Sequence, residues 1–235
     1  MATKFFKNFP EISYPIDNQI IKIKDYFKKA RIDDSSLDQI VEYTFYELEE
    51  GDRPDVVASK LYGNSELNWT FFLVNDISNY YEWYKWPSVF ENYIEEKYSG
   101  FVLVAQNTSD IITPTNKFLM GETVRTTTGF GNIKCVEPTF KRIAVDNVTG
   151  VFKSSQSLTG AISEKEFSIY EVQEHRDATA YFTDGKKRST VSTNGWTKVS
   201  YYDMETEINE SRRFIKVIKP SRIKSVVNQF EKVMS

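Results

Sequence analysis

The spacing of apolar positions predicts a short helix directly after Gly51. In "GDRPDVVASKLYG", Asp52 is placed to cap the helix, and Pro54 sits where its missing N–H costs nothing. Val57 and Leu61 lie four positions apart and therefore share one helical face. Gly63 offers the left-handed conformation that commonly ends a helix. The pattern predicts a helix that ends near Tyr62.

A second helical pattern follows at once. Ser65 is expected to cap it, and Trp69, Phe72 and Leu73 lie on one face until Asn75 interrupts the stripe. Both helices are shorter than the roughly 12 to 15 residues that are stable in isolation. We therefore expect them to pack on each other, with the stripes of the two helices buried together.

Elements on either side extend this unit. The alternation in "VEYTFYELEE", residues 41–50, predicts a strand before the first helix. A third helix is expected in "SVFENYIEEKY", residues 88–98, where Ser88 and Glu91 have the spacing of a capping box. The order is strand, helix, helix, helix.

The first 40 residues carry weaker signals. Residues 1–18 are aromatic without a period, which indicates an extended arm. Residues 19–32 fit two patterns, a helical stripe and a strand with alternating lysines, and both alternatives stay open. An arm of this kind is expected to become ordered on a partner.

Residues 101–200 are rich in β-strand signals. The Asp184-Gly185 and Asn194-Gly195 pairs are strong hairpin signals between strand-like runs, and "DNVTG", residues 146–150, is expected to form another hairpin turn. These signals predict an antiparallel meander. Further on, "SRIKSVVNQFEKVM", residues 221–234, has an apolar helical stripe that needs a packing partner.

Composition narrows the class of protein. The chain has 235 residues, a net charge of −3 and one cysteine, so neither a disulfide framework nor a thiolate zinc cage is expected. The N-terminus has no continuous apolar stretch, and no segment approaches the roughly 20 apolar residues of a membrane span. The aromatic residues, 14 Tyr, 17 Phe and 4 Trp, favour large cores or protein interfaces.

Candidate catalytic residues are few. Cys135 and His175 are the only members of their types; Cys135 lies in a strand-like run, and His175 is interpreted as a polar surface residue. No nucleotide-binding loop is present. The basic run that begins at Arg212 follows acidic residues, which favours a protein interface over nucleic acid. We expect no enzyme activity, no metal and no cofactor.

"YELEEGDRPDVVASKLYG" followed by "LNWTFFLVNDI" resembles a LysM-like unit. The continuation "EWYKWPSVFENYIEEKYSG" and the closing "NESRRFIKVIKPSRIKSVVNQFEKVM" are similar to the baseplate wedge component of contractile-tailed bacteriophages that contains such a unit. Ordinary LysM modules close with a second strand, whereas "ISNYYEWYKWP" takes that place here. The residues that carry the LysM-like motif or its core are Gly51, Asp52, Pro54, Val57, Leu61, Tyr62, Gly63, Trp69, Phe72, Leu73 and Asn75.

The sequence therefore predicts an α+β fold in four segments. These are an N-terminal extended arm and linker (1–40), a LysM-like domain with its following helix (41–100), an antiparallel β-rich module (101–202), and a C-terminal strand with an amphipathic helix (203–235). The resemblance implies a virion structural protein in the tail baseplate, assembled in the host cytoplasm. The alternative is a LysM-type module that attaches a larger machine to peptidoglycan or chitin.

The resemblance also implies partners. They are other wedge proteins, adjacent wedges and sheath-initiator or hub proteins, with several copies of this chain in a ring that closes around the hub. Neither nucleic acid nor membrane is expected to bind. The candidate interface residues are Phe5, Phe6, Phe9, Tyr14, Trp83, Trp86, Arg212, Arg213 and Phe230.

Overall fold

The computed structural model describes residues 9–17, 19–25, 43–110 and 118–234. It confirms the α+β class, with antiparallel sheets and a C-terminal helix. The chain divides into two compact units. Unit 1 contains Met1–Trp86 and Asn209–Ser235, and unit 2 contains Pro87–Ile208. Unit 2 is thus an insertion within the sequence of unit 1, a division that differs from the four predicted segments.

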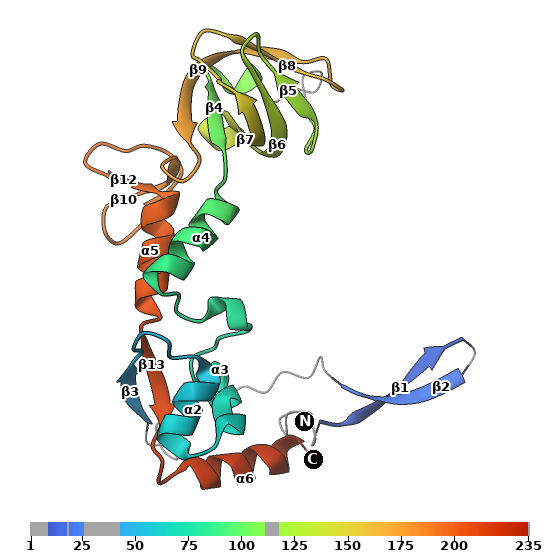
Figure 1. The fold of residues 1–235 in the computed structure, drawn as a ribbon, viewed down its shortest axis with the longest axis vertical. Coiled ribbons are helices and arrows are strands. Elements are labelled where there is room, and N and C mark those ends of the chain that lie inside the picture. The colour runs from blue at the N-terminus through green and yellow to red at the C-terminus, as the bar shows by residue number, and fades with distance from the viewer. Residues whose placement is uncertain (1–8, 18, 26–42, 111–117, 235) are drawn as a thin grey trace. The chain divides into compact units, whose positions relative to one another are not determined.

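Unit 1 is built on a two-stranded sheet and three helices (Figure 1). Its elements are β3 (Tyr43–Glu47), α2 (Pro54–Tyr62), α3 (Trp69–Val74), β13 (Phe214–Ile218) and α6 (Ile223–Met234). Strand β13 pairs with β3 in antiparallel register, from Phe214 opposite Glu47 to Ile218 opposite Tyr43. The strand predicted over residues 41–50 is confirmed in its centre.

The chain around α2 follows the local signals closely. Pro54 occupies the first turn, and Gly63 ends the helix with φ +66° while its N–H donates to the Ser59 carbonyl. The cap prediction for Asp52 is wrong, because the N-cap is Arg53 and the Asp52 carboxylate is bonded elsewhere. The predicted Ser65 cap is also wrong, since Asn64 caps a 3-10 turn at Ser65–Asn68 and α3 begins after that turn.

The N-terminal region contains a hairpin instead of an extended arm. Strands β1 (Glu11–Ile16) and β2 (Gln19–Lys24) pair from Glu11 opposite Lys24 to Ile16 opposite Gln19. The strand alternative for residues 19–32 is therefore correct over β2. Strand β1 does carry an alternation, with Ile12, Tyr14 and Ile16 at every second position, which the prediction of an arm without a period missed. Residues 1–8 lie outside the described part of the chain.

Unit 2 contains a closed six-stranded barrel with the strand order β4-β7-β6-β5-β8-β9 (Figure 1). Buried aliphatic and aromatic side chains fill the barrel, among them Leu103, Ile143 and Leu158. The barrel strands are β4 (Phe101–Ala105), β5 (Thr123–Arg125), β6 (Gly129–Glu137), β7 (Arg142–Gly150), β8 (Ser157–Gly160) and β9 (Glu166–Glu174).

The turn predicted at residues 146–150 is wrong, because β7 runs through this segment without reversing. Asn147 does adopt a left-handed conformation, with φ +50°. The register shifts there, so that Phe130 faces Thr149 while Asn132 faces Asp146. Two residues of β7 therefore lie opposite one residue of β6, which is a β-bulge. The sequence signal that predicted a turn marks this bulge.

A second sheet and two helices complete unit 2. The sheet has the order β11-β10-β12, with β10 at Thr179–Thr183, β11 at Arg188–Ser189 and β12 at Thr197–Ser200. The hairpin predicted at Asp184-Gly185 joins β10 to β11, whereas β12, after Asn194-Gly195, pairs with β10 and not with its predecessor.

Helices α4 (Pro87–Lys97) and α5 (Tyr201–Ser211) bring several tyrosines together in unit 2. The Glu205 carboxylate accepts hydrogen bonds from Tyr98, Tyr93 and Lys97. The capping box predicted for α4 is not formed, because Glu91 accepts bonds from Tyr202 and Arg176. The sequence pattern predicts no helix at α5, which spans the predicted boundary between the β-rich module (101–202) and the C-terminal segment (203–235).

Candidate functional site

The residues predicted to carry a LysM-like motif lie in a β-α-α-β unit formed by β3, α2, α3 and β13. The sequence lacked an obvious second strand near α3. The structure supplies it as β13, which starts more than a hundred residues later, after the whole of unit 2. The predicted strand-helix-helix arrangement therefore lacked one element. The remote strand β13 pairs with β3 and completes a two-stranded sheet.

The core of this unit differs from the predicted stripe. Val57 is fully buried as expected, but Phe71 is the large buried side chain of α3, and its ring contacts Tyr62 and Trp83. Trp69 is only partly buried and packs against Phe230. The predicted residues Leu61, Tyr62 and Phe72 pack at the edge of the core, and Leu73 is half-buried.

Asp52 organises the chain between β3 and α2. Its carboxylate accepts hydrogen bonds from the Lys60 ammonium at 2.7 Å, the Glu49 N–H at 2.9 Å and the Tyr46 hydroxyl at 3.0 Å. Burial alone raises the pKa of Asp52, but these donors outweigh it and lower that pKa. The Asp52 carbonyl accepts a further bond from the Trp83 indole. Asp52 therefore stabilises the turn after β3.

Asn75 joins the end of α3 to β13. Its amide nitrogen donates to the Lys216 carbonyl at 2.9 Å, and its amide oxygen accepts from the Lys216 N–H at 2.8 Å. The same nitrogen donates to the Phe71 carbonyl. The N–H and C=O groups of one strand residue point to the same side of the strand. Asn75 therefore forms hydrogen bonds with the edge of β13 that faces away from β3. The motif asparagine is therefore a structural link.

The outer face of the two-stranded sheet exposes aromatic side chains. Phe45 is 64% exposed and Phe214 is 56% exposed. The Tyr43 ring contacts Phe45 edge-on, and the Lys216 ammonium lies 5.1 Å from the centre of the Tyr43 ring. We call Tyr43, Phe45, Phe214 and Lys216 the outer sheet face. Its residues were not among the predicted interface residues, although the alternation in β3 contained the signal.

The predicted interface residues are scattered over unit 1. Phe5 and Phe6 lie outside the described residues, Phe9 is buried, and Tyr14 is 49% exposed on the β1-β2 hairpin. Trp83 is a buried core residue, and the half-buried Trp86 packs against that core. Trp83 was misassigned because a buried indole with a hydrogen-bonded N–H cannot be told from an exposed one by sequence.

The C-terminal candidates also have partners within the chain. Arg213 forms ion pairs with Glu47 and Glu210, and Arg212 is half-buried. Phe230 on α6 stacks near Trp69 with ring centres 4.5 Å apart. Ile223 and Val226 of α6 bury themselves against Val74 and Ile218. The apolar stripe of α6 therefore packs on its own β-α-α-β unit.

One cluster in unit 2 has the donor atoms of a metal site. Ligand atoms of Cys135, Glu137 and His175 lie within 4.8 Å of one another. The Glu137 carboxylate is already engaged, however, because it accepts bonds from the Arg142 guanidinium at 2.5 Å and the Tyr201 hydroxyl at 2.9 Å. A divalent cation would add positive charge beside this buried guanidinium, so the cluster suits an internal ion pair better than a metal.

Two members of this cluster, Cys135 and His175, are held in their neutral forms. Burial and the neighbouring Glu137 raise the pKa of the Cys135 thiol to about 11. Burial lowers the pKa of His175, which is 4% exposed and has a ring nitrogen 3.4 Å from the Ser99 carbonyl. The prediction of a surface histidine is wrong, because the ring packs edge-on against Tyr98 and Tyr201.

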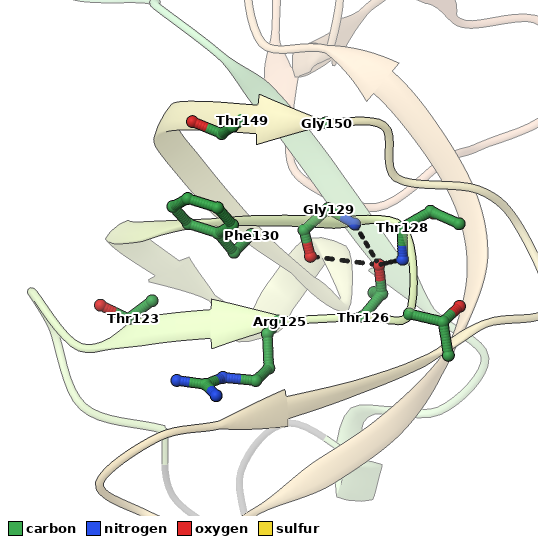
Figure 2. Close-up of a pocket in the computed structure, with 9 residues that line it drawn as sticks. Thr123, Arg125, Thr126, Thr128, Gly129, Phe130, Thr149 and Gly150 are labelled. Carbon is green, nitrogen blue, oxygen red and sulfur yellow. Dashed lines mark hydrogen bonds between the residues drawn. The ribbon is translucent and has the colours of Figure 1, made fainter.

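The barrel carries a hollow of about 580 Å³ on its surface. Figure 2 shows it along β5, β6 and β7, with Arg125, Phe130 and Thr149 on successive strands. The Thr126 hydroxyl donates to the Gly129 carbonyl and accepts from the Thr128 and Gly129 N–H groups, which fixes the turn at one end. The hollow was not predicted, since it is formed by residues that pair across strands.

Among the described residues, none of the helices is long and apolar enough to cross a membrane. The family described as base plate wedge protein 53 matches residues 1–107, from the N-terminal segment through β4. No curated protein matches the chain.

Proposed function

Because residues 1–107 match the base plate wedge protein 53 family, we take the chain to be a phage baseplate wedge component, and we propose that its β-α-α-β unit is a protein-binding adaptor. In this proposal the unit is LysM-like and joins a wedge to its neighbours. Several copies help to close a ring around the hub of a contractile tail, after assembly in the host cytoplasm. The partners are other wedge proteins, adjacent wedges, and sheath-initiator or hub proteins.

The outer sheet face is the observation that carries this proposal. Phe45 and Phe214 lie on neighbouring strands and are both more than half exposed. Aromatic side chains are enriched at protein interfaces because they supply contact area at a low entropy cost. The helices cover the other face of the sheet, where Ile215 and Val217 are buried. One face therefore stabilises the unit while the other is available to a partner.

The β1-β2 hairpin supports a second contact. Opposite residues in the register share a face, which puts Ile12, Tyr14, Ile16, Ile21 and Ile23 on one side of the hairpin. Tyr14 is 49% exposed and Ile16 is 45% exposed. An isolated two-stranded hairpin is marginally stable, so burial of this face on a partner would stabilise it. The hairpin takes the role that was predicted for an extended arm.

A reconstitution of wedges from purified baseplate proteins tests the adaptor. The double variant Phe45→Ser, Phe214→Ser removes the two most exposed rings of the outer sheet face without changing a buried residue. We expect it to fold, with unchanged circular dichroism, and to fail to enter wedges or rings. Tyr170→Ser is the matched control, since Tyr170 is a 66% exposed aromatic residue on the barrel strand β9. Normal incorporation of the double variant would refute the role of this face.

Deletion of residues 1–25 tests the hairpin in the same reconstitution. The shortened chain should keep the β-α-α-β unit and lose incorporation. If the shortened chain assembles normally, the hairpin is not an adaptor. If its β-α-α-β unit unfolds, the hairpin belongs to the local fold instead.

The carbohydrate alternative also gains support from β13. Ordinary LysM modules close with a second strand, and β13 supplies a strand in antiparallel pairing with β3. Calorimetry with N-acetylglucosamine oligomers separates the two functions. Saturable binding that is lost in the Phe45→Ser, Phe214→Ser variant would favour a LysM-type carbohydrate module, whereas the adaptor proposal expects no heat of binding. The prediction that the chain is not an enzyme stays a prediction.

A further inference from the structure

The hollow on the barrel combines an unpaired cation with an exposed aromatic ring. Arg125 and Phe130 are directly opposite each other in the pairing of β5 with β6, so their side chains leave the barrel on the same face. Val124, next to Arg125, points into the barrel and is fully buried. Phe130 is 49% exposed. In Figure 2 the ring and the guanidinium extend in different directions, and both line the hollow.

Neither group is used by the fold. Among the described residues, the Arg125 side chain has no hydrogen bond, ion pair or ring contact. Thr149 faces Phe130 on the next strand, and its exposed hydroxyl is also without a partner in the described part of the chain. A cation, an aromatic face and a free hydroxyl therefore lie in one row across β5, β6 and β7.

The rim of the hollow is held in place by backbone contacts. Gly150 has φ +83°, and a Cβ there would lie 2.2 Å from the Thr128 carbonyl oxygen. The Thr128 hydroxyl donates to the Val151 carbonyl at 2.6 Å, and Gln156 bonds to the same hydroxyl. These contacts fix the β5-β6 turn against the end of β7. A ligand would thus meet a preformed surface, which lowers the entropy cost of binding.

We propose that this hollow binds an acidic saccharide, with the guanidinium of Arg125 on the carboxylate and the Phe130 ring under the apolar face of a sugar ring. A guanidinium matches a carboxylate with two parallel hydrogen bonds. The Thr149 hydroxyl is placed to bond a sugar hydroxyl. The volume of about 580 Å³ falls within the roughly 300 to 1,000 Å³ of small-ligand sites.

The charge around the hollow disfavours nucleic acid. Arg125 is the only cation among the residues that line it. Single-stranded nucleic acid needs a groove with several cations along its backbone as well as aromatic platforms. One cation beside one ring and one free hydroxyl fits a sugar unit that has one carboxylate and several hydroxyls.

Titration of the ¹⁵N-labelled full chain with trigalacturonate tests this proposal by nuclear magnetic resonance. We expect saturable shifts of the amides at residues 123–130 and 149–150. Maltotriose, which has no carboxylate, should bind at the same amides about tenfold more weakly, because it lacks the charge-assisted pair with Arg125. Inorganic phosphate and a thymidine oligonucleotide are the two competing ligands.

Two variants separate the charge from the ring. Arg125→Gln should weaken trigalacturonate about tenfold and leave maltotriose unchanged, because only the acidic sugar uses the guanidinium. Phe130→Leu should weaken both sugars. The matched controls, Lys186→Gln and Tyr170→Leu, change an exposed cation and an exposed ring outside the hollow and should weaken neither.

The proposal is overturned by any of three results. The first is no saturable shift with trigalacturonate, or a shift that persists unchanged in Arg125→Gln. The second is phosphate binding to these amides as tightly as the sugar, which would define an anion site without sugar selectivity. The third is saturation by the oligonucleotide at lower concentration. Because each measurement uses the isolated chain, its outcome is independent of the reconstitution that tests the adaptor.

Discussion

Replacement of Asn75 by alanine should selectively destabilise unit 1. The substitution removes both hydrogen bonds that join this side chain to the Lys216 backbone, at 2.8 and 2.9 Å. The N–H and C=O of Lys216 would then lie beside the end of α3 without this partner. An unpaired buried backbone group costs about 1 to 3 kcal/mol, so the two together should lower the free energy of unfolding of the unit by about 2 to 6 kcal/mol.

The loss should be visible at the strand itself. Since each 1.4 kcal/mol is a factor of ten, about 2 to 6 kcal/mol corresponds to hydrogen exchange of the β13 amides faster by about 30-fold to about 20,000-fold. Mass spectrometry of peptides that cover residues 214–218 measures this rate. Peptides from the barrel should keep their protection, because the barrel has its own core.

Asn68→Ala provides the matched control. Asn68 is also an asparagine near α3, but its side chain bonds only locally, to the Ser65 carbonyl. We expect the hydrogen-exchange rate of the β13 amides in Asn68→Ala to stay within about threefold of the rate in the unchanged chain. The reason is that an exposed local hydrogen bond contributes only about 0.5 kcal/mol. Equal effects of the two substitutions, or a loss below 1 kcal/mol for Asn75→Ala, would refute the idea that Asn75 secures the remote strand.

Three further predictions concern the two cores. Phe71→Ala should cost about 3 to 5 kcal/mol of unit 1 stability and clearly more than Trp69→Ala, as measured by urea denaturation, because Phe71 is fully buried whereas Trp69 is not. Gly150→Ala should lower the melting temperature of the barrel, since the new Cβ clashes with a carbonyl at 2.2 Å and φ is +83°; an unchanged melting temperature would contradict that geometry. Burial alone raises the pKa of Glu122, but bonds from the Leu119, Ser163 and Ile162 N–H groups and the Ser163 hydroxyl outweigh it and lower that pKa. Because the pKa of Glu122 is lower in the folded state, its ionised carboxylate stabilises the fold at pH values above the unfolded-state pKa of about 4.3. This stabilisation is lost as the pH falls through the folded-state pKa. The difference in melting temperature between the unchanged chain and Glu122→Gln should therefore disappear in acid.

Local signals were sufficient where a residue's own backbone preference decides the structure. Pro54 and Gly63 defined the ends of α2, because one fits the first helical turn and the other accepts a left-handed conformation. The same reasoning failed at Asn147, where a left-handed residue forms a bulge within β7. A turn and a bulge demand the same local conformation, and only the partner strand distinguishes them.

Side-chain burial was harder to predict than the helices themselves. The stripe through Trp69 was assigned to the core because it is regular, but α3 packs between the sheet and α6, so more than one of its faces is covered. Phe71 faces the core that packs on the two-stranded sheet, and Trp69 faces Phe230 of α6. The second partner, α6, is remote in sequence, and a helical period cannot reveal it. The outer sheet face and the barrel hollow have the same origin, since both arise from pairing between strands.

The insertion of unit 2 also sets an order for synthesis. A nascent chain presents β3, α2 and α3 first, yet their strand partner β13 is synthesised only after the whole of unit 2. The barrel can form while synthesis continues, but the older N-terminal elements must wait, and contacts so distant in sequence are slow to form. A premature stop after residue 208 would therefore damage the beginning of the protein more than its middle. Such a truncated chain would expose Val57 and Phe71 and would be a substrate for cellular proteases, whereas the barrel would survive.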